Sequence, residues 1–453
     1  MVSCRLRRLV SVSLGLSALL LVSGYASNAR PLMPTPAVYL TEGADAVFDE
    51  VPPKRQWTRL ELFYITDRAA ETDPESGLPS GLPYAEGRSP ALAFGDAVVE
   101  MAPALPWPEL VRQSLLAERS AKVTLALGTV KEAGRFPAEP DAMEHIAGGV
   151  RRSRAVMTAH ELSKREFQTA LQQHLAHSPR RQVMLFVHGF NETFATAAYT
   201  TADLCHFFGR EHACAFFTWP AASSGNLLTG YTATTESGEY AIGHLVKTIR
   251  LLANTPGVEG LQLLAHSRGT AVMLSALREL AIQSIAAGYE PADILKIDNV
   301  VLMAPDIDAQ VARAKLVTFS SDPDLIARWD QERLPKVLNG RLTIYASPKD
   351  RALWVSKILF RSSNRLGRLS PEDISPAAQD NFSKWDNIDL IAYEGKITDF
   401  FDHAYSSSNP QVSSDLVQLI RYGRAPGEQG RELVPVGAKT WKFPEPTATA
   451  TRD

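Results

Sequence analysis

The sequence lacks the residue patterns that usually hold metals or phosphates. Only three of its 453 residues are Cys, and they form no cluster with His. There is no His-Glu-x-x-His pair and no glycine-rich phosphate-binding loop. We therefore expect neither a metal nor a cofactor in the functional site.

The sequence also lacks a basic run or stripe. Its 47 Lys and Arg face 50 Asp and Glu, for a formal net charge of -3. Nucleic-acid binding is not expected, because proteins that bind phosphate backbones concentrate their cations on one face. The remaining composition, 45% hydrophobic and 21% charged, is that of a globular protein with a sizeable core.

The N-terminal hydrophobic run, residues 9–22, is short for a membrane span, which needs about 20 residues. Three arginines precede it and Ala29 ends an acceptable cleavage site, so residues 1–29 are predicted to be a secretory signal peptide. A retained signal anchor is the alternative. Beyond this segment only Cys205 and Cys214 remain, either as a disulfide or as two buried thiols.

From residue 182 onward, strand patterns alternate with helix patterns. Residues 183–187 are a continuous apolar run, as in a parallel strand that is buried on both faces. Repeated strand–helix units predict an α/β fold with a mostly parallel sheet and helices on both faces. Upstream, residues 163–177 are predicted to be a helix that begins with a capping box of Ser163 and Glu166. Further strands are expected at residues 59–66, 91–101 and 122–130.

A turn with a single serine separates one of these strands from its helix. Residues 260–271 read Gly-Leu-Gln-Leu-Leu-Ala-His-Ser-Arg-Gly-Thr-Ala, with Ser267 in the turn. This layout is typical of a nucleophile elbow, which presents a serine hydroxyl at the end of a strand. We predict that Ser267 is a nucleophile, with a helix N-cap as the alternative role.

The order of residues along the chain selects the base. Folds with a nucleophile elbow order their triad as Ser, acid, His. His403 is the only histidine after Ser267, since the other nine precede it. His403 is therefore the predicted base, and a surface loop histidine is the alternative.

The acid of the triad has two candidates at strand ends. Asp350 follows the predicted strand 341–346 and precedes a helix, so it is expected at the carboxyl edge of the sheet beside Ser267. Asp306 and Asp308 occupy the same kind of position one strand earlier. Asp350 is the preferred acid and Asp306 the alternative, because either strand end could reach the imidazole.

The loop after the 183–187 strand is a candidate oxyanion loop. It reads His188-Gly-Phe-Asn, and Gly189 lets the backbone turn close to a substrate. The N–H groups of Phe190 and Arg268 are the predicted donors to a tetrahedral oxyanion. The alternative is an ordinary turn with Asn191 as N-cap. His188 precedes the serine and is interpreted as structural.

Seven motifs in a fixed order resemble a bacterial family of α/β-hydrolase fold that is catalogued as domain of unknown function 900. The resemblance implies that fold, Ser267 as nucleophile and His403 as base, and it favours Asp350 as acid. It implies no substrate. One departure is Arg268, which stands where Met is usual; it either attracts an acidic substrate or, as we prefer, forms a salt bridge outside the pocket. The motifs are His188-Gly-Phe-Asn191, Phe217-Thr-Trp-Pro220, Ala265-His-Ser-Arg-Gly269, Ala304-Pro-Asp306-Ile-Asp308, Asp350-Arg-Ala-Leu353, Arg365-Leu-Gly367 and His403-Ala-Tyr405.

Together these observations predict an exported serine hydrolase, in the periplasm or at the cell envelope, that cleaves small carboxylic esters through an acyl-enzyme. The alternative is a non-catalytic binding or envelope-interaction module on the same fold. Peripheral envelope association and the oligomeric state stay open. The predicted organisation is a signal peptide at 1–29, a linker at 30–56, strands and a helix that extend the core at 57–180, the α/β-hydrolase catalytic domain at 181–424 and a flexible tail at 425–453.

Overall fold

A computed structural model describes most of the chain. The predicted signal peptide lies outside the described residues, except for Ala29. Within them, no helix has both the length and the apolar character needed to cross a membrane. The described residues are 29–41, 47–71, 83–221, 227–317, 334–395 and 403–444.

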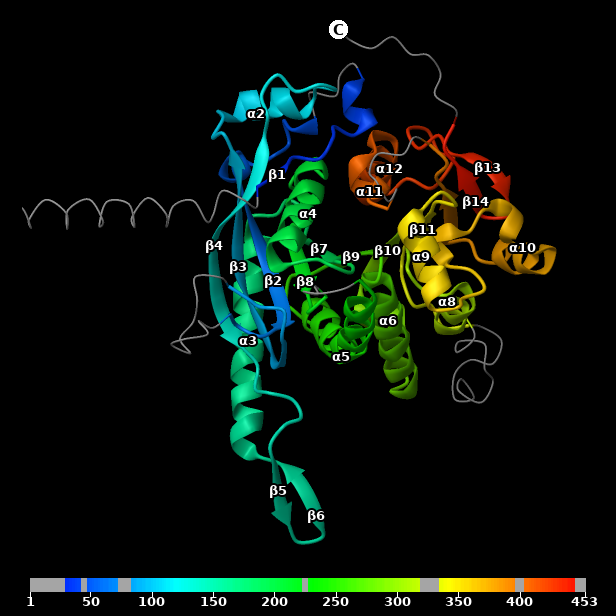
Figure 1. Ribbon diagram of the computed structural model, residues 1–453. Helices are drawn as coiled ribbons and strands as arrows, with labels where there is room; N and C mark the ends of the chain where they lie inside the picture. The colour runs from blue at the N-terminus through cyan, green and yellow to red at the C-terminus, as the bar shows by residue number, and fades with distance from the viewer. Residues whose placement is uncertain are drawn as a thin grey trace, which may run out of the picture.

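Twelve strands of the described chain form one mixed sheet through the centre of the molecule (Figure 1). Eight adjacent strands in its middle are parallel, and antiparallel strands continue it at both edges. The sheet thus includes the three strands predicted upstream of residue 180. In spatial order it contains β1 (Arg30–Pro31), β4 (Thr124–Arg135), β3 (Arg88–Ala102), β2 (Arg59–Arg68), β8 (Ala213–Thr218), β7 (Gln182–Val187), β9 (Gly260–His266), β10 (Ile297–Met303), β11 (Leu342–Ala346), β12 (Ile388–Ala392), β14 (Thr440–Lys442) and β13 (Val434–Gly437).

Helices cover both faces of this sheet, which confirms the predicted α/β architecture (Figure 1). α3, α5 and α6 pack on one face, and α4 and α12 pack on the other. The helices are α2 (Trp107–Ser114), α3 (Arg154–Ala176), α4 (Phe194–Phe207), α5 (Leu227–Ala253), α6 (Gly269–Ala286), α7 (Pro291–Leu295), α8 (Ala309–Leu316), α9 (Arg351–Leu359), α10 (Pro376–Ser383), α11 (Tyr405–Ser408) and α12 (Pro410–Ile420).

The apolar run in β7 shows why the central strands are hydrophobic throughout. Val183, Leu185 and Val187 belong to the core under α3, α5 and α6. Met184 and Phe186 belong to the opposite core under α4 and α12. Because successive side chains of a strand alternate between faces, a strand that is buried on both sides must be apolar at every position.

The order of the strands determines where a ligand can bind. The chain runs outward from β7 to β8 and then returns to place β9 on the other side of β7. In doubly wound sheets, the loops at the carboxyl ends of the strands separate at such a reversal and leave a crevice. The loops that flank it here begin at His188 and at Ser267.

Two predictions about the N-terminal half were wrong. The expected linker at 30–56 is packed in its described part, since β1 pairs with β4 and Tyr39 and Phe48 are buried. α3 begins at Arg154 rather than at the expected capping box, because the hydroxyl of Ser163 donates to the carbonyl of Arg135 at 2.8 Å instead of capping a helix.

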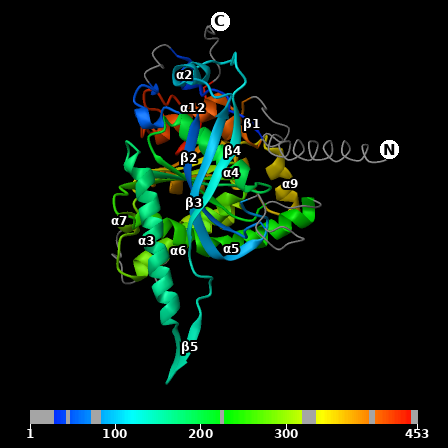
Figure 2. The same ribbon diagram turned by 90° about the vertical axis from the view of Figure 1, so that its left-hand side faces the viewer.

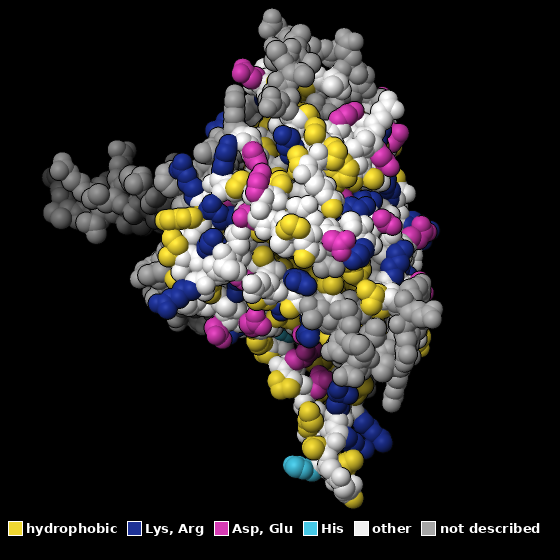
Figure 3. Space-filling model, turned by 90° about the vertical axis from the view of Figure 1, so that its right-hand side faces the viewer, with side chains coloured by type: hydrophobic (Ala, Val, Ile, Leu, Met, Phe, Trp, Pro, Cys, Tyr) yellow, Lys and Arg dark blue, Asp and Glu magenta, His cyan; other side chains and the backbone are white. Residues whose placement is uncertain are grey.

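The first turns of α3 and a separate hairpin form an arm, residues 143–162, that projects from the body (Figures 1 and 2). In the hairpin, β5 (Met143–Ile146) pairs with β6 (Gly149–Arg152). Hydrophobic side chains are exposed along the arm, among them Met157 and Leu162 (Figure 3). Composition had not distinguished this segment from the rest of the N-terminal half.

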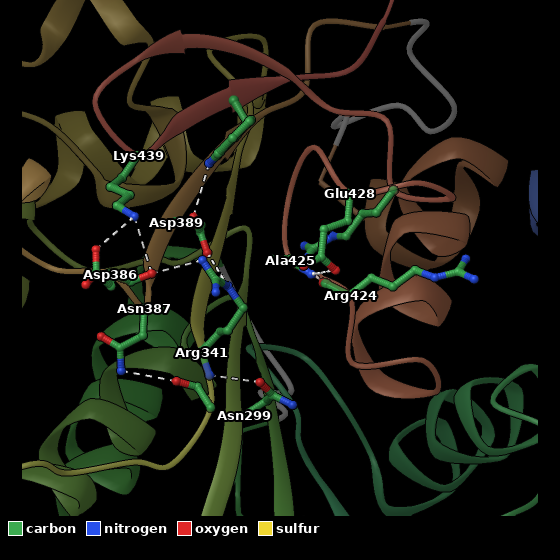
Figure 4. A network of polar contacts seen from close by, with 12 residues as sticks. Asn299, Arg341, Asp386, Asn387, Asp389, Arg424, Ala425, Glu428 and Lys439 are labelled. Carbon is green, nitrogen blue, oxygen red and sulfur yellow. Dashed lines mark hydrogen bonds and ion pairs between the residues drawn. The ribbon is translucent and has the colours of Figure 1, made fainter.

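In its described part, residues 425–444, the predicted flexible tail is folded. After Arg424 the chain forms the β13–β14 hairpin, and β14 pairs in parallel with β12. Trp441 donates its Nε1–H to Asp389 at 3.1 Å. The ammonium of Lys439 lies 3.5 Å from the Asp386 carboxylate (Figure 4). Asp389 also accepts a 2.7 Å bond from Arg341 (Figure 4). These long-range partners order a segment whose composition resembles a tail.

Cys205 and Cys214 form a disulfide, which decides between the two alternatives that the sequence left open. It joins the last turn of α4 to the second residue of β8. Both sulfurs are buried in the core between α4 and the sheet.

We expect the protein to lose stability as the pH falls below about 6.5. Burial lowers the pKa of His188 and His212 from 6.5 to about 3, and neighbouring arginines add to this effect. Between those pH values the unfolded chain binds protons that the folded chain excludes. Stability is therefore full above pH 6.5 and falls by up to about 1.4 kcal/mol per pH unit for each such histidine.

Urea denaturation at about pH 7.5 and about pH 5.5 measures this dependence. Neither ring nitrogen of His212 has a hydrogen-bond partner in the described chain. His212→Phe should therefore lose less stability on acidification than the wild type. Equal losses in the two proteins would contradict the assignment.

Candidate active site

Ser267 occupies a strained turn between β9 and α6. Its φ is +52°, a conformation that residues other than glycine rarely adopt. The turn is held from both sides: the Ser267 N–H donates to Met303 O at 2.9 Å, and the Ser267 carbonyl accepts from the Asp306 N–H at 3.2 Å. Backbone strain that the surroundings maintain in this way is characteristic of functional sites.

Two glycines allow the loops after β7 and β9 to meet. A Cβ on Gly189 would lie 2.6 Å from the Cβ of Ser267 and 3.2 Å from its Oγ. A Cβ on Gly269 would overlap the carbonyl oxygen of His188. Neither position can hold a residue larger than glycine, because the candidate oxyanion loop lies directly against the serine.

His188 holds the oxyanion loop and is not available as a base. The Trp219 N–H donates to His188 Nε2 at 3.1 Å, so the proton of the neutral ring is on Nδ1, which donates to Gly189 O at 2.9 Å. Burial, assisted by Arg68, lowers the pKa of His188 to about 3. The ring therefore stays neutral, and it also stacks on Trp219 with centroids 5.6 Å apart.

The two predicted oxyanion donors have no acceptor of their own. Within the described chain, neither the Phe190 N–H nor the Arg268 N–H donates a hydrogen bond, whereas the next amide, of Asn191, donates to Ala221 O at 2.8 Å. Arg268 is also the N-cap residue of α6, whose amides carry partial positive charge. Both amides lie in the loops that meet at Ser267.

His403 and Asp350 are joined by a hydrogen bond. His403 Nδ1 lies 2.7 Å from Asp350 Oδ2. Asp350 is fully buried as the N-cap of α9, and its other oxygen accepts from the Leu353 N–H at 2.9 Å. The carbonyl of His403 is 3.2 Å from Nε2 of His266, the residue before Ser267, and the two imidazole rings are 4.9 Å apart.

The alternative acid, Asp306, has different partners. Its Oδ1 accepts from the Ser356 hydroxyl at 2.6 Å and lies 3.4 Å from Nε of Arg365. Burial raises the pKa of Asp306, and the charge of Arg365 counteracts that rise. Asp308 instead caps α8 through its side chain. Of the three candidates, Asp350 is the one bonded to the histidine.

Comparison with known protein families identifies the family and the fold. A model of the family described as "Alpha/beta hydrolase of unknown function (DUF900)" matches residues 163–422, more than half of the chain. The chain belongs to this family. The resemblance inferred from the seven motifs is thereby confirmed. No curated protein matches the chain significantly.

Arg268, where we expected a departure from the usual Met, does not form the salt bridge that we preferred. Its guanidinium lies over the rings of Phe360 and Tyr231, with centroid distances of 5.5 and 6.0 Å. In the described chain, no carboxylate lies within ion-pair distance of the Arg268 guanidinium. Burial, and then the nearby Arg365, lower the pKa of Arg268 to about 10, so it is charged at neutral pH.

Sequence reasoning missed several residues that support the site of this DUF900 member. Arg368 donates to Asp350 O at 2.7 Å and so holds the turn that carries the acid. Gly367, in the motif that had no assigned role, has no space for a Cβ beside Pro305. The ring of Tyr231 packs against that of Phe190, with the two ring centroids 5.2 Å apart. The only sequence signal for this region was the motif that contains Arg365 and Gly367.

In the described chain no cluster of His, Cys, Asp and Glu side chains could hold a metal ion.

Proposed function

We propose that this DUF900 member is a serine hydrolase that cleaves carboxylic esters with Ser267, His403 and Asp350. The observation that carries the proposal is the 2.7 Å bond from His403 to a fully buried carboxylate, on a histidine that lies against the residue before a strained serine. A purely structural histidine would not require the serine to adopt a positive φ.

The chemistry follows from the position of the protons. With the Nδ1–H of His403 donated to Asp350, Nε2 takes the hydroxyl proton as Ser267 attacks the ester carbonyl. The amides of Phe190 and Arg268 donate to the oxyanion of the tetrahedral intermediate. The imidazolium then gives its proton to the leaving alcohol, and an acyl group remains on Ser267. Water then gives a proton to His403 as it attacks the acyl carbon. The bond to the Ser267 oxygen breaks, the imidazolium returns its proton to that oxygen, and the acid is released.

The proposal includes export to the periplasm or the cell envelope. Buried disulfides persist in oxidising compartments and are rare in the cytosol of most organisms. The bond between Cys205 and Cys214 supports this location, as does the signal-like N-terminal sequence.

A panel of matched p-nitrophenyl esters, thioesters and anilides tests the proposed reaction. We expect turnover of the short-chain esters, because the site supplies a nucleophile, a base and an oxyanion hole but no feature specific for amides. Mass spectrometry of the purified protein under non-reducing conditions checks that the disulfide is intact. Failure to turn over any acyl substrate would favour the non-catalytic binding module.

A further inference from the structure

α9 presents large hydrophobic side chains to solvent. Its inner side carries Leu353 and Ser356, which are buried. Its outer side carries Trp354, 53% exposed, with Val355 and with Ile358, 57% exposed. The spacing i, i+1, i+4 places these three on one stripe. A surface helix normally directs polar residues outward, so this stripe marks a docking surface.

The charges that α9 and the turn after it present to solvent have one sign. Residues 349–368 contain six Lys or Arg, of which Arg365 is buried beside Asp306, and one acid, Asp350, which is buried against His403. Lys357 and Arg361 form no ion pair in the described chain. Figure 3 shows the face of the molecule that lies to the right of Figure 1, where α9 is located; hydrophobic, basic and acidic side chains are interspersed on it. We define the α9 surface as Arg351, Trp354, Val355, Lys357, Ile358 and Arg361.

Apolar and aromatic side chains bracketed by cations are the composition of helices that lie in the interface of an anionic membrane. The charge also disfavours a second copy as the occupant. A symmetric contact would bring the same surface of two chains together, and would place the cations of one against those of the other.

The α9 surface is continuous with the candidate site. Phe360, the C-cap of α9, is partly exposed and lies 5.1 Å from the ring of Tyr231, which in turn lies 5.2 Å from Phe190 in the oxyanion loop. At the other end of the same helix, Asp350 bonds to His403. Ring contacts therefore connect the end of α9 to the oxyanion loop beside Ser267.

We propose that the α9 surface docks on an anionic lipid surface, and that the substrate is an ester-bearing amphiphile drawn from it. The proposed docking is inferred from α9 alone, whereas the proposed substrate class rests on the proposed function. The stripe holds the protein at the boundary between headgroups and acyl chains, and the cations contact the lipid headgroups.

Co-sedimentation with vesicles tests the docking. The wild-type chain should bind vesicles of mixed phosphatidylcholine and phosphatidylglycerol but not pure phosphatidylcholine, and binding should weaken from about 0.1 M to about 1 M salt. Trp354→Glu/Ile358→Glu and Lys357→Glu/Arg361→Glu should each bind at least about tenfold more weakly. The control Met157→Glu/Leu162→Glu, exposed apolar positions on the arm, should bind like the wild type.

Turnover tests the substrate class. Trp354→Glu/Ile358→Glu should keep its turnover of water-soluble p-nitrophenyl acetate and lose about tenfold or more on a long-chain p-nitrophenyl ester dissolved in the anionic vesicles. Ser267→Ala should bind vesicles normally, so failed chemistry and failed docking are separate results. Docking is overturned if wild type ignores anionic vesicles, if both α9 variants bind as well as wild type, or if sedimentation shows a dimer that the α9 variants dissociate.

Discussion

Ser267→Ala should lower the turnover of a short-chain p-nitrophenyl ester by about 10⁴-fold or more. The expected loss is large because the hydroxyl is the protein group that forms a covalent bond to the substrate in the proposed mechanism. Alanine should fit at this turn, because its side chain is smaller than that of serine, although the strained φ of +52° remains. The variant should therefore fold, and the loss should appear in kcat rather than in stability.

Ser284→Ala is the matched control. Ser284 lies in α6, the helix that follows Ser267, is similarly buried, and donates its hydroxyl to Leu280 O within that helix. Its removal should leave turnover unchanged within experimental error. If Ser267→Ala kept turnover close to that of the control variant, the nucleophile would have to be another residue.

Asp350→Asn should lower turnover by about 10⁴-fold with little change in KM for the soluble ester. The Asn amide can still accept from Leu353, so the N-cap of α9 is preserved. Toward His403, however, the amide presents a donor where the carboxylate accepts from Nδ1. The imidazole then adopts the other tautomer and cannot take the serine proton.

Asp306→Asn distinguishes the two acids. Removing that charge leaves the buried guanidinium of Arg365 without its counterion, so we expect a loss of about 3 kcal/mol in the free energy of unfolding but turnover within a few-fold of the wild type. Thermal unfolding and ester kinetics on the two variants separate the roles. If Asp306→Asn abolished turnover and Asp350→Asn preserved it, the assignment of the acid would be reversed.

Local pattern and chain order predicted much of the fold and most of the candidate site. The apolar run of β7 and the strand–turn–helix around Ser267 are local signals, and they led to the central sheet. His403 was selected because no other histidine follows Ser267, and Asp350 because it follows a strand. The two were chosen by separate arguments, and they are hydrogen-bonded in the structure.

Long-range packing accounts for what the sequence analysis missed. The hairpin that ends at Lys442 is ordered by Asp386 and Asp389, about 50 residues away, which no local pattern reveals. The surroundings of Arg268 depend on rings from α5 and from the end of α9. The orientation of α9 also depends on tertiary contacts, because both of its sides carry apolar residues and periodicity alone cannot tell which is buried.

Fluorophosphonate labelling followed by peptide mapping tests the central claim most directly, because only an activated serine reacts with this probe. We expect the wild-type chain to take up one probe molecule, on the peptide that contains Ser267, and we expect Ser267→Ala to take up none. Heat-unfolded wild type should also stay unlabelled, which shows that the folded site activates the hydroxyl. An unlabelled wild type, or a label that maps to another serine, would contradict the account.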